Sequence, residues 1–230
     1  MTAAGHRPPP ARCRAVSRPE GLALAGTDVL RVDTAAAAPA DMRRFVTMNP
    51  FHFDPAWRIP VPGSDHRSCS MESVWQAQKL VDGCTDPTLF ERPPVKRPPD
   101  DQRGAGFDYR ASAFRYDDRV LDLVSARYLV YLPAYLYLLE HLVPEPVVQE
   151  ITGALAAGRE VVFYDWDENH DIEESGSSFS HSAILAAWFG GRLAEEFLRR
   201  RDRWLADHPD LPTTGTDPFP LTRYQRLHRH

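Results

Sequence analysis

The feature that most constrains the fold is an apolar run from Asp118 to His141, "DRVLDLVSARYLVYLPAYLYLLEH". A helix that is apolar around most of its surface has to be buried on most sides, so this run predicts the centre of the core. Pro133 lies inside the run and lacks a backbone N–H, so we expect it to end or kink the helix. The run therefore predicts two helical pieces packed in the core.

Two strand signals accompany this helical core. The segment "EVVFYDW" (160–166) is the stronger, and "DVLRVDT" (28–34) alternates apolar with polar residues. Helical patterns occur at 70–83, 144–158 and 181–207, but strands and helices do not alternate regularly. The sequence thus predicts an α+β fold: a helix-dominated single domain around a small sheet, with polar loops meeting at one end.

Composition sets the expected limits of this domain. Residues 1–25 are rich in Pro, Arg and Ala and are expected to be disordered. The domain is expected to span 26–207, and a flexible tail to follow at 208–230. Within the domain, 43–63 mixes aromatic residues with four prolines, which predicts an irregular or edge-strand segment rather than a helix. Five prolines and two glycines predict a long loop at 86–110.

Charge and composition also limit the partners. A net charge of −5 argues against bulk affinity for nucleic acid or anionic membranes, but allows one nucleotide at a local basic patch. No apolar run reaches the roughly 18 residues needed to span a bilayer, and the N-terminus lacks the apolar stretch of a secretory signal. Three cysteines without a C-x-x-C pattern fit reduced thiols. We expect a cytoplasmic protein, and the sequence does not determine its oligomeric state.

The first candidate site is the helical segment "SMESVWQAQKLVDG" (70–83), which holds one of only two lysines beside twenty-five arginines. Glu72, Gln76 and Lys79 share one helical face, so their polar groups can converge on a ligand. This face is either the wall of an active site or an ordinary solvated surface. Trp75 is either a core residue or a platform on which a base stacks.

The second candidate is the acidic loop that follows the strand at 160–166, "DWDENHDIEES". Carboxylates in such a loop bind a hard cation, supply a general base or are merely solvated. The spacing is not that of a calcium-binding EF-hand. Asp165 and Asp167 are the better site candidates because they leave a buried strand and flank Trp166.

Two further segments supply polar or cationic groups. In "SSFSHSA", Ser180 is the expected N-cap of the last helix, whose N-terminal N–H groups can hold phosphate or carboxylate. His181 is either an acid or base, or a capped surface histidine. In "VKRPPDDQRG", Lys96, Arg97 and Arg103 lie on a proline-stiffened loop and can grip phosphate.

Metal and cofactor motifs are not recognisable in the sequence. The spacing of His52, His66, Cys69 and Cys84 is not that of a zinc site. The phosphate-binding loop, the dinucleotide-binding fingerprint and the nucleophile elbow are likewise missing. We therefore expect neither a metal nor a cofactor.

Taken in order, several of these segments resemble the NADAR family of N-glycosidase-like proteins. The segments are "NPFHFD", "PVPG", "SMESVWQAQKL", "VKR" and "EVVFYDWDENHDIEES", over roughly 45–190. The family's helix has the form (T/S)xEhxxQaxKa, and its last segment contains WGxG, which is missing here. The layout is more similar still to an uncharacterised family from high-G+C bacteria and their phages.

The resemblance implies a hydrolase of an N-glycosidic bond, acting on a nucleotide, an ADP-ribose conjugate or a phosphoribosyl-linked base. The alternative is a non-catalytic nucleotide- or ADP-ribose-binding module, or a partner-binding protein. The resemblance implies Glu72 as the essential carboxylate and Asp165 or Asp167 as the later acid. The residues expected to contact the substrate are Trp75, Gln76, Lys79, Lys96, Arg97, Trp166, Ser180 and His181.

Overall fold

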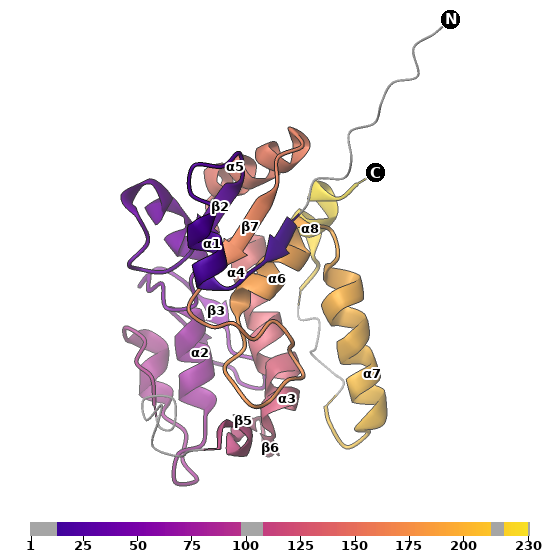
Figure 1. The fold of residues 1–230 in the computed structure, drawn as a ribbon. Helices are drawn as coiled ribbons and strands as arrows, with labels where there is room; N and C mark the ends of the chain where they lie inside the picture. Colours follow the sequence, from indigo (N-terminus) through magenta and orange to yellow (C-terminus); the bar gives the residue numbers. More distant parts are fainter. Residues whose placement is uncertain (1–12, 98–107, 213–218, 230) are drawn as a thin grey trace, which may run out of the picture.

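The sheet at the centre of the fold is parallel. The computed structural model describes residues 13–97, 108–212 and 219–229. Strand β7 (Val161–Tyr164) lies between β1 (Cys13–Ala15) and β2 (Leu30–Asp33), and Val161 is opposite both Cys13 and Leu30. Helices cover this sheet and extend well beyond it (Figure 1). The expected α+β class is confirmed.

The position of β7 explains its unbroken apolar sequence. Its four residues are buried because both faces of the sheet are covered. Val161 and Phe163 belong to the main core, whereas Val162 and Tyr164 form a small second cluster with Val16. Helix α6 (His181–Phe189) packs on β1 and β7 from the side of the main core.

The N-terminal region departs from the expectation of disorder. Residues 13–25 contain β1 and helix α1 (Arg18–Ala23), which begins at the N-cap Ser17. Gly21 packs directly against the ring of Tyr164, where a Cβ atom would overlap the ring. Disorder was therefore a wrong prediction for 13–25, because three residues that pair with a distant strand carry little local signal. Residues 1–12 lie outside the described part of the chain.

The apolar run forms α3 (Leu123–Ala126), a wide π-helical turn η5 (Arg127–Tyr131) and α4 (Leu132–His141) in direct succession. Pro133 lies in the first turn of α4, where a missing N–H is tolerated. The N–H of Leu132 donates to the carbonyl of Arg127, five residues back, so the chain widens immediately before the proline. The expected interruption is thus a π turn rather than a break.

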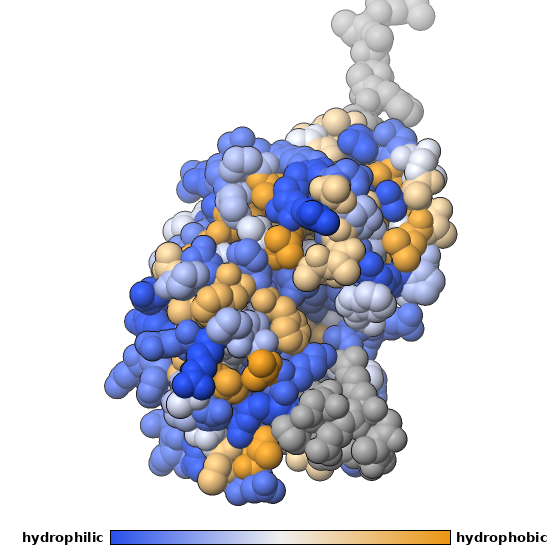
Figure 2. Space-filling model, turned by 90° about the vertical axis from the view of Figure 1, so that its left-hand side faces the viewer, coloured by the Kyte–Doolittle hydropathy of each residue, from blue (hydrophilic) through white to orange (hydrophobic). Residues whose placement is uncertain are grey.

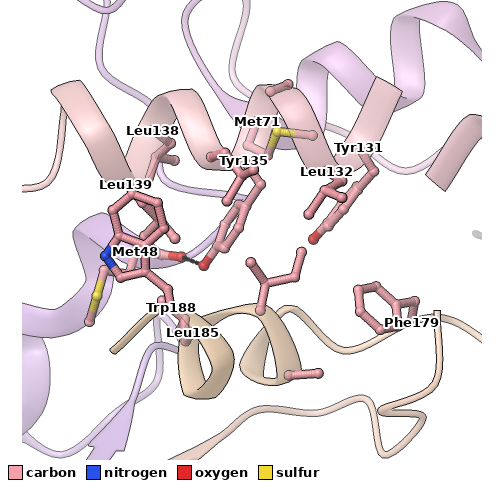
Figure 3. Packing of buried hydrophobic residues seen from close by; sticks show 14 of the residues in the cluster. Met48, Met71, Tyr131, Leu132, Tyr135, Leu138, Leu139, Phe179, Leu185 and Trp188 are labelled. Carbon is pink, nitrogen blue, oxygen red and sulfur yellow. Dashed lines mark hydrogen bonds between the residues drawn. The ribbon is translucent and has the colours of Figure 1, made fainter. Parts of the chain in front are cut away.

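Figure 3 shows how α4 packs on α6. Tyr131, the last residue of η5, and Tyr135 of α4 project toward α6, Tyr131 on the side of Phe179 and Tyr135 on the side of Leu185 and Trp188. The Tyr135 hydroxyl donates to the carbonyl of Met48 (2.6 Å), which satisfies this buried polar group. The two helices therefore share one buried interface.

Three other helices follow the sequence pattern at their starts. These are α2 (Met71–Gln78) with N-cap Ser70, α5 (Glu145–Ala156) and α6 (His181–Phe189). Helix α2 ends at Gln78, earlier than the expected end near Gly83. The reason is that Lys79 turns to extended backbone and pairs with a strand residue, Phe114.

The last helix was expected to run unbroken over 181–207, and this prediction is wrong. Helix α6 ends at Phe189, before Gly190 and Gly191, and Gly191 has a φ of +73°. The chain then continues through the π turn η6 (Ala194–Leu198) into α7 (Arg199–Asp207). Two adjacent glycines are sufficient to end the helix.

The C-terminal region also departs from expectation, because α8 (Thr222–Leu227) packs back on the domain. The Glu140 carboxylate accepts hydrogen bonds from the backbone N–H groups of Arg223 and Tyr224, at 2.7 and 2.8 Å. Glu140, which lies in α4, thus satisfies backbone N–H groups at the start of α8, a helix far from it in sequence. A flexible tail is a wrong prediction for residues 219–229, and residues 213–218 lie outside the described part.

Shorter elements complete the fold. Antiparallel pairs form between β3 (Ile59–Pro60) and β4 (Arg67–Ser68), and between β5 (Phe114–Tyr116) and β6 (Arg119–Leu121). The segment 43–63 contains the expected short strand, but it starts within a 3₁₀ helix, η1 (Ala40–Met48), that was not expected. Two more 3₁₀ turns, η2 (Pro87–Glu91) and η4 (Tyr109–Ala111), lie at the two ends of the segment 86–110 that was expected to be a long loop, and residues 98–107 of this segment lie outside the described part of the chain.

On the surface, apolar residues lie scattered among polar ones. Figure 2 shows hydrophobic residues scattered between hydrophilic ones on the face that it presents. Over the described ranges, no helix is both long and apolar enough to cross a membrane.

Candidate functional site

A cavity of about 430 Å³ lies where the end of β7 meets the starts of α2 and α6. Functional residues of proteins with parallel sheets commonly lie beyond the carboxyl ends of the strands, and this cavity has that position. The sequence predictions that contribute to its lining are Glu72, Trp75, Lys96, Asp165, Trp166, Asp167 and His181. The structure thus brings together residues from four separate segments of the chain.

Glu72 enters the cavity from the first turn of α2. Its carboxylate accepts a hydrogen bond from Gln76 Nε2 (2.8 Å), and its backbone N–H donates to the carbonyl of Pro50 (2.8 Å). Glu72 is only 7% exposed, and Gln76 is fully buried. The face of α2 that carries them is therefore a buried wall and not a solvated surface. Gln76 orients Glu72 and does not itself line the cavity.

Lys79 and Arg97 lie away from the lining. Lys79 follows the last turn of α2, is 1% exposed, and has its Nζ 6.0 Å from the centroid of the Phe114 ring. The backbone N–H of Arg97 donates to Gln76 Oε1 (3.0 Å), and its guanidinium donates to the carbonyls of Gln76 and Lys79 (3.0 and 2.7 Å). Arg97 thus caps the C-terminus of α2, where a cation is favoured. Arg103 lies outside the described residues.

Asp165 is the most heavily bonded carboxylate of the site. It accepts hydrogen bonds from the Ser180 and Ser182 hydroxyls (2.8 and 3.0 Å) and from the backbone N–H of Asp167 (2.6 Å). Nδ1 of His181 lies 2.8 Å from its Oδ2. Burial opposes ionisation of Asp165, but His181 and these hydrogen bonds outweigh it and lower the pKa to about 2. Asp165 is therefore a fixed negative charge.

His181 connects this carboxylate to a residue that the sequence did not single out. Its Nε2 atom lies 2.6 Å from the hydroxyl oxygen of Thr34, which is fully buried at the carboxyl end of β2. The carbonyl of Thr34 accepts a hydrogen bond from Asn49, which lines the cavity. Thr34, His181 and Asp165 thus form one hydrogen-bonded chain behind the cavity wall, and Ser180 serves it as N-cap and as donor to Asp165.

The mouth of the cavity has two aromatic rings near cations. Trp166 is 68% exposed, and the guanidinium carbon of Arg18 lies 4.3 Å from its ring centroid. Arg18 is held by the buried Asp33 (3.0 Å). The Nζ atom of Lys96 lies 5.5 Å from the centroid of the Phe51 ring. Exposed rings at a cavity mouth are suited to stacking on a planar ligand.

The inner wall comes largely from residues that the sequence analysis did not select. Trp75 packs edge-on against Tyr131, with ring centroids 5.5 Å apart, and also contacts the tilted ring of Phe114 in the core. Trp75 is thus a core residue and a lining residue at once. Burial raises the pKa of Tyr131 well above 10, and Glu72 and other carboxylates add to this effect. The Tyr131 hydroxyl therefore stays protonated and can donate to a ligand.

Arg127 also comes from the apolar run and lines the cavity, and it anchors a neighbouring loop. Its guanidinium donates to the backbone carbonyls of Ile172, Glu174 and Ser177. Burial lowers its pKa, but the group stays charged because the ordinary value is far above neutrality. Arg127 holds the loop between β7 and α6 in place, and this loop carries Asp167 and Phe179 to the cavity.

The remaining acids of this loop face away from the cavity or into solvent. Asp171 and Glu173 pair with Arg200 of α7, at 2.6 and 3.1 Å. Across the described part of the chain, no group of three or more His, Cys, Asp or Glu side chains is arranged to hold a metal ion.

Comparison with known proteins identifies a family for the chain but does not identify an activity. Residues 20–185 match the model of a family described as a family of unknown function (DUF6939). Among the described residues, all those that line the cavity fall within this range. Neither a curated protein nor a solved structure matches the chain.

Proposed function

The chain belongs to the family of unknown function DUF6939, and from its cavity we propose that it hydrolyses an N-glycosidic bond in a nucleotide-like ligand. One observation carries the proposal: Glu72, Asp165 with His181, and a set of aromatic rings line the same cavity. The likeness of α2 to the E-x-x-x-Q-x-x-K helix of NADAR proteins supports the same chemistry. The ligand classes are a nucleotide, an ADP-ribose conjugate or a phosphoribosyl-linked base.

The reaction needs a carboxylate beside the sugar. Breaking the C1′–N bond leaves positive charge on the sugar ring, water adds its oxygen to C1′, and one proton passes to the leaving nitrogen. Glu72 is suited to stabilise that charge because Gln76 and the backbone bond to Pro50 hold it in one orientation. Asp165 is suited less to direct attack, since its oxygens already accept several internal hydrogen bonds.

Proton transfer and binding fall to other residues. Tyr131 can donate to the leaving base, and Asp167 can orient the attacking water. Trp75, Trp166 and Phe51 offer rings for the base, while Lys96 offers a cation for phosphate. The volume of about 430 Å³ falls within the range of small-molecule sites.

The proposal includes a cytoplasmic location. Cys13, Cys69 and Cys84 are free thiols in the structure, as suits a reducing compartment. Burial raises the pKa of Cys13 to about 12, so this thiol is unreactive.

The test is to incubate the full chain with ADP-ribose conjugates and phosphoribosyl-linked bases and to measure the released base by chromatography. We expect release by the wild type, a loss of at least about a hundredfold in Glu72→Gln, and little change in Glu91→Gln, an exposed control carboxylate in η2. Equal release by wild type and Glu72→Gln would exclude the assigned role of Glu72. A ligand that raises the melting temperature without any base release would instead support the non-catalytic binding module.

A further inference from the structure

Trp166 has the most exposed large hydrophobic side chain in the part of the chain that the structure describes, with 68% of its surface accessible. It follows shortly after the end of β7 and lines the cavity of the candidate site. Exposure alone assigns no role, because single apolar residues are common on protein surfaces. The groups that support the indole ring supply the further evidence.

Arg18, at the start of α1, covers one face of this ring. Its guanidinium carbon lies 4.3 Å from the centroid of the Trp166 ring and 5.9 Å from that of the buried Tyr164 ring. A guanidinium over an indole is held there by cation–π attraction. Arg18 does not itself line the cavity. The accessible surface of Trp166 therefore lies on the ring edges and on the face opposite Arg18.

Asp33 fixes Arg18 in this position. Nη1 of Arg18 lies 3.0 Å from both carboxylate oxygens of Asp33, which is fully buried as the last residue of β2. The register of the sheet places Asp33 opposite Tyr164, and Oδ1 also accepts the backbone N–H of Ala35 (2.9 Å). Removing one partner of a buried ion pair is strongly destabilising, so the pair stays closed. The indole thus rests on a preorganised support.

The charge behind the indole determines which ring can stack in front of it. A cation on one face draws π-electron density toward itself, so the opposite face attracts a neutral, electron-rich ring and repels a second cation. The carboxylate of Asp165 acts in the opposite sense, but internal hydrogen bonds from Ser180 and Ser182 already compensate it. A neutral nucleobase has the required flat π-face.

Given the nucleotide-like ligand of the proposed function, we propose that Trp166 stacks on the base and makes the site select a neutral base over a cationic ring. Arg18 and Asp33 are the positioning residues, because they act on the ligand only through the indole. The role belongs to binding, so it does not depend on which residue breaks the glycosidic bond.

The experiment is calorimetric titration of the full chain with adenosine monophosphate, nicotinamide mononucleotide and ribose phosphate. The three share a phosphorylated ribose and carry a neutral purine, a cationic pyridinium and no ring. We expect adenosine monophosphate to bind most tightly and to quench the red edge of the tryptophan emission, which comes from exposed indole. Trp166→Ala should weaken its binding at least about tenfold, to the level of ribose phosphate, while Trp166→Phe should retain most of it.

Arg18→Gln tests the support, because it removes the cation and leaves the indole. The preference for adenosine monophosphate over nicotinamide mononucleotide should fall about three- to fivefold, and Arg18→Lys should restore part of it. Arg44→Gln is the matched control. Arg44 lies 4.4 Å from the centroid of the Phe45 ring and pairs with Glu150, and neither Arg44 nor Phe45 lines the cavity.

Four results overturn the proposal: no saturable binding of adenosine monophosphate, equal or tighter binding of nicotinamide mononucleotide, unchanged affinity in Trp166→Ala, or an unchanged preference in Arg18→Gln. Thermal unfolding of each variant verifies that the fold is kept. Binding that depends on Trp166 without any base release would retain the stacking role and remove the hydrolysis. Base release with binding that is independent of Trp166 would do the reverse.

Discussion

Nδ1 of His181 lies 2.8 Å from Oδ2 of Asp165, and the opposite ring nitrogen lies 2.6 Å from the hydroxyl of Thr34. Both nitrogens of the imidazole are thus engaged inside the protein, and the ring is held in a single orientation at the cavity wall. A histidine held in this way exchanges protons with a ligand only if one of these bonds opens. Asp165 and His181 therefore form a rigid part of the cavity wall.

The Asp165 carboxylate predicts a distinct pH dependence of stability. Its pKa of about 2 lies below the ordinary value of 3.8, so its ionised form stabilises the folded state above about pH 4. This contribution, roughly 2.5 kcal/mol, is lost as the pH falls toward 2.

We expect the free energy of unfolding, measured with urea between pH 5 and 2, to fall more steeply in wild type than in Asp165→Asn. Asp171 and Glu173 also have lowered pKa values, through hydrogen bonds and ion pairs, but they contribute equally to both proteins. Parallel curves for the two proteins would contradict the assigned pKa.

Thr34 is expected to stabilise the site through its hydroxyl alone. Thr34→Val keeps the shape but leaves Nε2 of His181 buried without its partner, so we expect a loss of about 1–3 kcal/mol in the free energy of unfolding. Thr34→Ser retains the hydroxyl and should lose clearly less. Urea denaturation measures both, and nitrogen NMR of the His181 ring should change in the valine variant only. Equal stabilities of the two variants would show that the hydroxyl is unimportant.

Gly21 and Gly153 form a matched pair of helical glycines. Alanine at Gly21 would place a methyl group into the ring of Tyr164, so we expect Gly21→Ala to destabilise by about 1–3 kcal/mol. A Cβ at Gly153 in α5 meets open space, and Gly153→Ala should stabilise by up to about 1 kcal/mol through helix propensity. Thermal melts distinguish the two; a neutral Gly21→Ala would mean that α1 does not pack closely on β7.

Glu140 is expected to hold the C-terminal helix on the domain. In Glu140→Ala the amides of Arg223 and Tyr224 lose their acceptor, so their hydrogen exchange should accelerate at least about tenfold. Glu145→Ala is the control, because Glu145 contacts α8 through side-chain ion pairs with Arg223 and Arg226, is itself partly exposed, and should change exchange little. Identical exchange rates in the two variants would show that α8 is held by other contacts.

The sequence predicted those helices and strands whose formation depends on residues that are close together in the chain. The strand at Val161–Tyr164 and the helix starts after Ser70 and Ser180 follow from β-branched runs and capping side chains. Strand β1 escaped prediction because its three residues become a strand only by pairing with β7. The Gly190–Gly191 pair did carry a local signal for the end of α6, and the apolar pattern around it outweighed that signal in the prediction.

The residues of the candidate site also divide into those that local sequence patterns predicted and those that they did not. Glu72 and Asp165 were found because acids at a helix start and after a buried strand stand out in the sequence. Tyr131 and Arg127 were not found, since they lie within a run whose apolar character explains it fully as core. Thr34 could be recognised only once β2 was placed beside β7, which brings the two strand ends together.

The π turn η5 begins at Arg127 and ends at Tyr131, and both residues line the cavity. An α-helix advances about 100° per residue, so one extra residue in a turn resets the phase of everything that follows. Deleting a single residue there would restore regular winding and rotate α3 by about 100° relative to α4. The side chains of α3 and α4 could then no longer all keep their places in the core around the cavity, so the packing behind the site depends on one surplus residue in its central helix.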